Sequence, residues 1–337
     1  MKIDISENNM KLKYPFGISR HTYYSQQNVI VQLQHEGLYG YGEATTNPYY
    51  KITIENLISA FKSVELKLKN YNFKTPDQFF LDFSDLLHTN SFALGALNNA
   101  SWDLYGKLLH KPVKDLIDLP VMNPAQTSYT LGIDTKEKML DKLKATPWPI
   151  YKIKLGTEAD IPLIKYLRNH TNAVFRVDAN CAWNASETIE KSTELKELDI
   201  EFIEQPLPRD DSGQKKCYEQ SALPLMADES CCVETDVETC IGHFHGINIK
   251  LLKCGGLSPA IRMLRKAKKY GMKVMIGCMT ETSVGISAAA QLLPFVDYVD
   301  LDGPMLLAVD LAEGLHFEAG GIDISPSSGL GINYIGK

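Results

Sequence analysis

Short apolar runs recur along the chain between residues 128 and 302, and most of them end on a polar residue. From Lys154 to Lys250 these polar ends follow each other at intervals of 22 to 26 residues. One strand, one helix and two short loops fill about that length. The runs therefore predict eight strands, near 128–132, 150–155, 174–178, 200–204, 224–228, 246–251, 273–278 and 297–302.

The segments between these runs have the apolar spacing of amphipathic helices. Strands that alternate with helices predict a parallel sheet, and eight such strands predict a closed (β/α)7β barrel of the TIM type. In such barrels the chemistry occurs at the carboxyl ends of the strands, which is where the polar residues fall.

The first part of the chain has a different pattern. Three strands are expected, followed by three helices, which together predict an α+β capping domain. The strands are expected at 2–14, 28–33 and 39–44, a loop at 17–27, and the helices at 53–70, 76–88 and 91–108. We place the capping domain at residues 1–112 and the barrel at 113–311, and we expect the tail, about 312–337, to return to the capping domain.

Composition narrows the class of protein. A chain of 337 residues exceeds one barrel of about 250 residues, which agrees with a second domain. The net charge of −6 argues against nucleic acid or an anionic membrane as a partner. We find no apolar run long enough to span a membrane and no secretory signal. Seven cysteines without a Cys-x-x-Cys pair suggest reduced thiols and a cytoplasmic location.

Three carboxylates end successive predicted strands, namely Asp178, Glu204 and Asp228. Neighbouring strands lie about 4.8 Å apart, so these groups should converge and repel each other unless a cation neutralises them. Oxygen ligands without His or Cys favour Mg²⁺ over Zn²⁺. Each acid alone could be a loop residue or a helix cap, but three in register favour a metal site.

Lysines lie on both sides of the predicted acids. Lys152 and Lys154 share one face of a strand, and Lys250 lies four strands further round the ring, so it should face Lys154 across the barrel mouth. Adjacent, buried ammonium groups should have depressed pKa values, which would suit a base near neutral pH. The alternative is that these lysines extend to solvent.

This arrangement implies proton transfer next to a carboxylate or carbonyl. A divalent cation would stabilise an enolate, one lysine would remove the α-proton, and the other would return a proton from the opposite face. The expected outcome is racemisation or epimerisation. Asp300 and Asp302 share a face further on, and they could form a second metal site, hold a substrate ammonium group, or pair with barrel lysines.

These motifs resemble the enolase superfamily and its muconate-lactonising subgroup. The matching segments are Lys152-Ile-Lys154, Val177-Asp178-Ala-Asn180, Glu204-Gln-Pro206, Ala227-Asp228-Glu-Ser230 and Ile249-Lys250-Leu-Leu-Lys253-Cys-Gly-Gly256. Asp300-Leu-Asp302-Gly-Pro304 is similar to the dipeptide epimerases, in particular the L-Ala-D/L-Glu epimerases. The superfamily uses a Lys or His base with Mg²⁺, so that mechanism also follows from the resemblance.

The resemblance implies a role for each matched residue. Lys154 and Lys250 would be the acid/base catalysts, Asp178, Glu204 and Asp228 would bind one Mg²⁺, and Lys152 would support the substrate carboxylate. Asp300 and Asp302 would hold the α-ammonium group of a dipeptide. Thr130 matches a threonine that contacts substrate, and the backbone near Cys278 matches a stretch that lines the pocket.

The loop 17–27 should close over the barrel and contact the substrate side chain. Family members selective for Glu place an Arg there, and Arg20 is the Arg available, although His21 or Tyr23 could occupy that position instead. Glu as the second residue is thus a hypothesis, with an apolar or cationic residue as the alternative.

The expected function is a Mg²⁺-dependent dipeptide epimerase that acts on cell-wall peptide, an isomerase. The alternatives are an o-succinylbenzoate synthase or muconate cycloisomerase of the same subgroup and, third, a non-catalytic binding protein. The resemblance also suggests a homo-oligomer.

Overall fold

The computed structural model describes residues 1–336 and begins with a three-stranded antiparallel sheet in the order β1-β2-β3. The strands are β1 (Lys2–Ile18), β2 (His21–His35) and β3 (Leu38–Thr45). They are longer than predicted. The predicted loop 17–27 is wrong, because this segment forms the outer end of the β1–β2 hairpin.

The hairpin tolerates the residues that led us to expect a loop. The pairing register shifts between Lys11 and Phe16, and the irregular segment contains Pro15, which has no N–H to donate to a neighbouring strand. Pairing resumes where Phe16 lies opposite Tyr23, and the hairpin turns at Ser19 and Arg20. The result is a two-stranded arm that carries Arg20 at its tip.

Three helices pack on this sheet, as predicted. They are α1 (Ile54–Lys69), α2 (Pro76–Ser84) and α3 (Ser91–Leu108). The side chains of Thr53, Thr75 and Asn90 each accept a backbone N–H at the start of a helix, which explains where the three helices begin. The capping domain has a core of its own, formed largely by apolar residues of these helices and of β2.

Eight parallel strands form the second sheet, in the order β11-β10-β9-β8-β7-β6-β5-β4. They are β4 (Tyr129–Leu131), β5 (Ile150–Lys154), β6 (Val174–Asp178), β7 (Ile200–Glu204), β8 (Leu225–Ala227), β9 (Gly246–Lys250), β10 (Lys273–Gly277) and β11 (Tyr298–Asp300). A parallel bridge between Thr127 and Val299 joins the two ends of the sheet. The predicted fold class is therefore confirmed.

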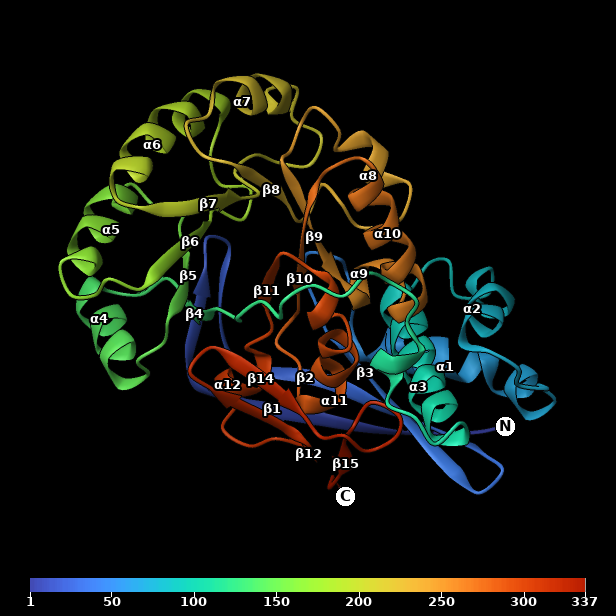
Figure 1. Ribbon diagram of the computed structural model, residues 1–337. Helices are drawn as coiled ribbons and strands as arrows, with labels where there is room; N and C mark the ends of the chain where they lie inside the picture. The colour runs from blue at the N-terminus through green and yellow to red at the C-terminus, as the bar shows by residue number, and fades with distance from the viewer. Residues whose placement is uncertain (337) are drawn as a thin grey trace.

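Helices cover the outside of the barrel, and Figure 1 shows α4 to α8 and α10 as an arc around the strands. The helices of this part are α4 (Lys136–Ala145), α5 (Asp160–Arg168), α6 (Ala185–Glu197), α7 (Gln214–Gln220), α8 (Asp236–Thr239), α9 (Leu251–Cys254), α10 (Leu257–Lys269), α11 (Ser283–Ala290) and α12 (Gly303–Leu306), with 3₁₀ turns η1 (Val113–Leu116) and η2 (Leu293–Phe295). The largest apolar core lies between these helices and the strands.

The end of the chain packs against both the barrel and the first sheet. Figure 1 shows β12 and β15 below β1. Its short strands are β12 (Ala312–Glu313), β13 (Leu315–Glu318), β14 (Gly321–Ile324) and β15 (Asn333–Tyr334). The ring of Tyr334 stacks on Tyr41 of β3, and Leu330 N donates to Asp103 of α3. The residue numbers at which we divided the domains stay a prediction.

A buried carboxylate joins the first sheet to the barrel. Glu43 of β3 is 0% exposed and accepts hydrogen bonds from the backbone N–H groups of Thr282 and Gly285 at the start of α11. The partial positive charge of a helix N-terminus favours such an anion. This contact helps to fix the hairpin arm relative to the barrel mouth.

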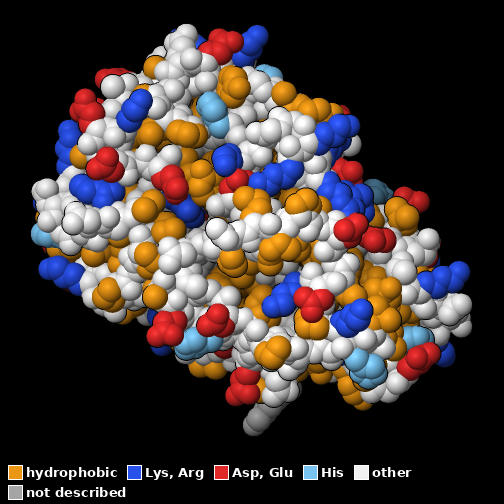
Figure 2. Space-filling view, viewed as in Figure 1, with side chains coloured by type: hydrophobic (Ala, Val, Ile, Leu, Met, Phe, Trp, Pro, Cys, Tyr) orange, Lys and Arg blue, Asp and Glu red, His pale blue; other side chains and the backbone are white. Residues whose placement is uncertain are grey.

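Acidic and basic side chains are interspersed over the face shown in Figure 2. Among the residues that the structure describes, no helix is both long and apolar enough to cross a membrane.

Candidate active site

The carboxyl ends of the barrel strands carry the predicted acids and lysines. Lys154 ends β5 and Lys250 ends β9, and β6, β7 and β8 lie between them in the sheet. Asp178 ends β6, Glu204 ends β7, and Asp228 directly follows β8. The strand order thus places three acids between two lysines at one end of the barrel.

The three acids form one buried cluster. Asp178, Glu204 and Asp228 each offer an oxygen, and these oxygens lie within 4.8 Å of one another. Burial, together with the charge of Asp178, raises the pKa of Glu204 to about 7. Burial would also raise the pKa of Asp178, but Lys154 and Lys152 lower it to about 2. Three carboxylates buried this close together repel each other unless positive charges neutralise them, and a lysine ammonium group contacts each of the three.

The cluster fits a divalent metal ion. Within residues 1–336, it is the one group of three His, Cys, Asp or Glu side chains that could hold such an ion. Glu204 Oε2 is buried and accepts no hydrogen bond from the described residues, and its contact with Lys152 Nζ is an ion pair, so this oxygen has no hydrogen bond to lose when it binds an ion. An all-oxygen set of carboxylates suits Mg²⁺.

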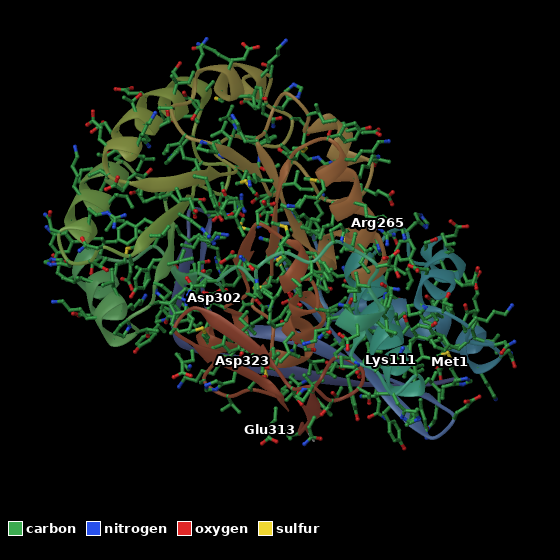
Figure 3. The ribbon with its side chains drawn as sticks, viewed as in Figure 1. Met1, Lys111, Arg265, Asp302, Glu313 and Asp323 are labelled. Carbon is green, nitrogen blue, oxygen red and sulfur yellow. The ribbon has the colours of Figure 1, made fainter. Side chains whose placement is uncertain are left out.

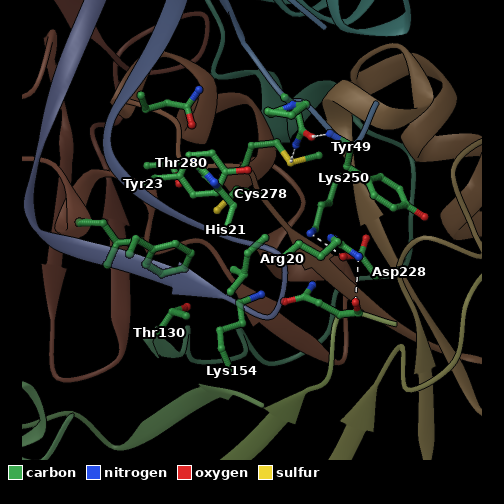
Figure 4. Close-up of a pocket in the computed structure, with 18 of the residues that line it drawn as sticks. Arg20, His21, Tyr23, Tyr49, Thr130, Lys154, Asp228, Lys250, Cys278 and Thr280 are labelled. Atoms are coloured by element: carbon green, nitrogen blue, oxygen red, sulfur yellow. Dashed lines mark hydrogen bonds and ion pairs between the residues drawn. The ribbon is translucent and has the colours of Figure 1, made fainter. Parts of the chain in front are cut away.

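The two predicted catalytic lysines pair with acids of neighbouring strands. Lys154 Nζ lies 2.6 Å from Asp178 Oδ2, and Lys250 Nζ lies 2.7 Å from Asp228 Oδ2. Both lysines are at most 10% exposed. Figure 4 shows them reaching into the same pocket from different strands. The alternative that they extend to solvent is wrong.

Lys152 lies among the acids. Its Nζ is 2.7 Å from Asp300 Oδ2 and 2.7 Å from Glu204 Oε2, the second contact being an ion pair without hydrogen-bond geometry. A third contact, to Asp178 Oδ2, measures 3.2 Å. The ammonium group of Lys152 therefore bridges the acid cluster and Asp300.

The predicted depression of the lysine pKa values is wrong for Lys152 and Lys250. Burial lowers the pKa of Lys152, but Asp300 and the other nearby acids outweigh burial and raise it well above its usual value. Burial is likewise outweighed by Asp228 at Lys250, whose pKa is also raised. The reason is that carboxylates contact these ammonium groups directly.

Sequence reasoning missed two residues that hold the acids in place. Lys253 of α9 donates to Asp228 Oδ1 and to the carbonyl oxygen of Asp228, both at 2.6 Å. Asn248 of β9 donates to Glu204 Oε1 at 2.8 Å. The signal for Asn248 was available, because it lies two residues before Lys250 and therefore on the same face of its strand.

Asp300 and Asp302 are both buried and line the site, and Asp302 is labelled in Figure 3. Asp300 forms an ion pair with Lys152, which agrees with the predicted alternative that these acids pair with barrel lysines. Asp302 lies between β11 and the first residue of α12, and its Oδ2 accepts a hydrogen bond from the backbone N–H of Thr130 at 2.6 Å. Burial and the charge of Asp300 raise the pKa of Asp302 to about 7. No further acid completes a second metal site among the described residues.

A cavity of about 480 Å³ opens above these residues. The predicted residues that line it are Arg20, Thr130, Lys152, Lys154, Asp228, Lys250, Cys278, Asp300 and Asp302. His21 and Tyr23 of the hairpin arm also line the cavity, with their rings in edge-to-face contact. The structure therefore brings all the predicted substrate-binding residues to one cavity.

Arg20 reaches this cavity but already has partners. It donates to Asn180 O at 2.8 Å and to Glu229 Oε1 at 3.1 Å, and its guanidinium lies 4.4 Å from the ring centre of Tyr49. Glu229 was another residue that sequence reasoning missed, although it follows Asp228 directly.

Both parts of the chain match known families. Residues 1–118 match the N-terminal domain of mandelate racemase and muconate lactonizing enzyme, and residues 134–335 match a family described as enolase C-terminal domain-like. The chain belongs to the enolase superfamily. Its predicted membership of that superfamily is confirmed.

Relatives of this enolase-superfamily chain include L-Ala-D/L-amino acid epimerases from Maribacter sp. and Flavobacterium johnsoniae. The first is 51% identical and the second 47%, and each alignment covers at least 98% of both chains. A solved structure of dipeptide epimerase from Cytophaga hutchinsonii, complexed with Mg and the dipeptide D-Ala-L-Val, superimposes with a TM-score of 0.93 at 28% identity. The superposition covers 98% of this chain and 95% of the Cytophaga hutchinsonii chain.

Proposed function

We propose that this protein is a Mg²⁺-dependent epimerase that inverts the α-carbon of the second residue of a dipeptide. The observation that carries the proposal is the placement of Lys154 and Lys250 on either side of the acid cluster, in a cavity that also contains Asp300 and Asp302. The activities named for the relatives support it: epimerisation of L-Ala-D/L-amino acids, and a complex with Mg and a dipeptide.

Asp178, Glu204 and Asp228 would hold the Mg²⁺ ion. When bound, this ion would bind the substrate carboxylate and stabilise the negative charge that develops beside the α-carbon. Asp302 and Asp300 would accept hydrogen bonds from the α-ammonium group of the dipeptide, because both carboxylates are buried and line the cavity.

The two lysines would then exchange protons with the α-carbon. For one stereoisomer, Lys154 Nζ would take the α-proton and Lys250 Nζ would deliver a proton to the opposite face, which inverts the configuration. For the other stereoisomer the roles would be reversed. Both ammonium groups line the cavity, and Lys152 would position the substrate carboxylate.

The proposal is tested by incubating a dipeptide library with the protein and Mg²⁺ in D₂O. We expect deuterium at one α-carbon and formation of the second diastereomer. Dehydration of a cyclohexadiene acid, with no exchange into dipeptides, would instead identify an o-succinylbenzoate synthase. Exchange in neither substrate class would indicate a binding protein. A protein with Asp228→Asn, which removes one ligand charge, serves as the matched inactive control.

The residue at the second position of the dipeptide, self-association, a cytoplasmic location and a role in cell-wall peptide metabolism stay predictions. Sedimentation analysis of the purified protein would test the predicted homo-oligomer.

A further inference from the structure

Resting on the proposed epimerase function, we propose that Glu229 neutralises Arg20, so that the pocket for the second residue selects an uncharged side chain over an acidic one. Glu229 is thereby a specificity-determining residue. This differs from the expectation that Arg20 is free to meet a substrate carboxylate.

The position of the pocket follows from the strand order. The ammonium end of the dipeptide would lie near β11, where Asp300 and Asp302 are, and its carboxylate end at the acid cluster. Arg20 and Glu229 line the cavity, and Glu229 directly follows Asp228 after β8, three strands from β11 in the sheet. Figure 4 shows Arg20 reaching towards Asp228. The side chain of the second residue would therefore face this pair.

Arg20 has little freedom to leave Glu229. The Glu229 side chain is 3% exposed, and Arg20 is its one hydrogen-bonding side-chain partner among residues 1–336. Moving Arg20 onto a substrate carboxylate would remove the side chain that hydrogen-bonds to this buried carboxylate and would leave Lys250 as the nearby positive charge that opposes it, which is unfavourable. Asn180 O and the ring of Tyr49 hold the guanidinium in the same place.

The charges at this end of the pocket therefore balance before substrate binds. An acidic side chain would add a second carboxylate to one guanidinium in a confined space. An amide of the same shape would bring no charge and could still accept a hydrogen bond from Arg20. Glu and Gln at the second position thus form a matched pair that isolates the effect of charge.

The test measures the binding of L-Ala-L-Glu, L-Ala-L-Gln and L-Ala-L-Lys to the Mg²⁺-loaded protein by calorimetry, together with kcat/KM. In the unaltered protein, we expect Gln to be preferred over Glu. In Glu229→Gln, Arg20 is released, and the preference for Glu over Gln should rise about tenfold or more, the usual size of one charge-assisted contact.

For a second variant, Arg20→Met, we expect the charge preference to change in the opposite direction. In this variant Glu229 loses its hydrogen-bonding partner Arg20, and the preference for Lys over Gln should rise about tenfold. The double variant, with neither charge, should return towards the selectivity of the unaltered protein. An Arg20 that acted alone would lose Glu in Arg20→Met but would gain no preference for Lys.

Several results would overturn the inference. A preference for Glu over Gln in the unaltered protein, or an unchanged ratio in Glu229→Gln, would show that Arg20 serves the substrate despite Glu229. If Glu229→Gln does not fold, as judged by circular dichroism, the inference is tested with Arg20→Met alone. If the preference of Arg20→Met for Lys over Gln does not rise, the proposed neutralisation of Arg20 by Glu229 is refuted. If the unaltered protein binds none of the three dipeptides, the inference fails, whereas the proposed function is decided separately by α-proton exchange in the dipeptide library.

Discussion

Lys253 offers a direct test of how the acid cluster is held. Its Nζ shares its three N–H groups among four acceptors: two on Asp228 and the carbonyl oxygens of Cys231 and Asn248, at 2.6 to 3.1 Å. The side chain is 1% exposed and that of Asp228 is 3% exposed. In Lys253→Met the apolar stem remains and the ammonium group is lost.

The expected cost follows from this burial. Breaking a buried ion pair by removing one partner costs about 3–5 kcal/mol. Asp228 retains Lys250 as a partner, which reduces the loss, but three buried carbonyl oxygens lose a donor, at about 1–3 kcal/mol for each that stays unsatisfied. We therefore expect Lys253→Met to lower the free energy of unfolding by about 4 kcal/mol.

Urea unfolding in the presence of a metal chelator measures this loss. Lys165→Met is the matched control, because Lys165 forms a 2.9 Å ion pair with Glu194 in which both side chains are about half exposed. Its loss should cost about 0–1 kcal/mol. If Lys253→Met costs no more than Lys165→Met, the reasoning from burial is refuted.

Three further predictions concern the site itself. Lys154→Ala and Lys250→Ala should each abolish α-proton exchange from one dipeptide diastereomer more strongly than from the other, as followed by NMR in D₂O; equal losses would contradict opposed roles. Asp228→Asn should weaken Mg²⁺ binding by at least about tenfold in calorimetry, because one charged ligand is lost; unchanged affinity would exclude Asp228 as a ligand. Asp302→Asn should raise KM for dipeptides about tenfold or more, as a charge-assisted contact to the ammonium group is weakened; an unchanged KM would argue against that contact.

The barrel could be predicted because its strands are buried on both faces and end on polar residues. Each predicted barrel strand overlaps an observed one. The hairpin arm could not be predicted in the same way. Its residues Ile18, Tyr23 and Gln26 line the cavity, so this segment mixes polar and aromatic side chains and lacks the alternation of a strand on an apolar core.

The positions of the acids were predictable for a similar reason. Parallel strands bring their carboxyl ends to one edge of the sheet, so a residue's place at a strand end is sufficient to locate Asp178 or Glu204. Lys253 lies beyond its strand, in α9, and its contact with Asp228 depends on the path of the chain after β9. Strand periodicity contains no information about that path.

Charge pairing is the property that the sequence left undetermined. We expected Lys152 and Lys154 to depress each other's pKa because they are two residues apart on one strand. The closest partners of Lys152 are instead acids on other strands. The separation between Arg20 and Glu229 is 209 residues, and the contact exists only because the hairpin arm reaches the barrel mouth. A free arginine and a neutralised one have the same sequence signature, but they select substrates of different charge. Selectivity in this site therefore depends on which carboxylate the folded chain brings to Arg20, and a substitution at Glu229 should change it without altering any residue proposed to take part in proton transfer.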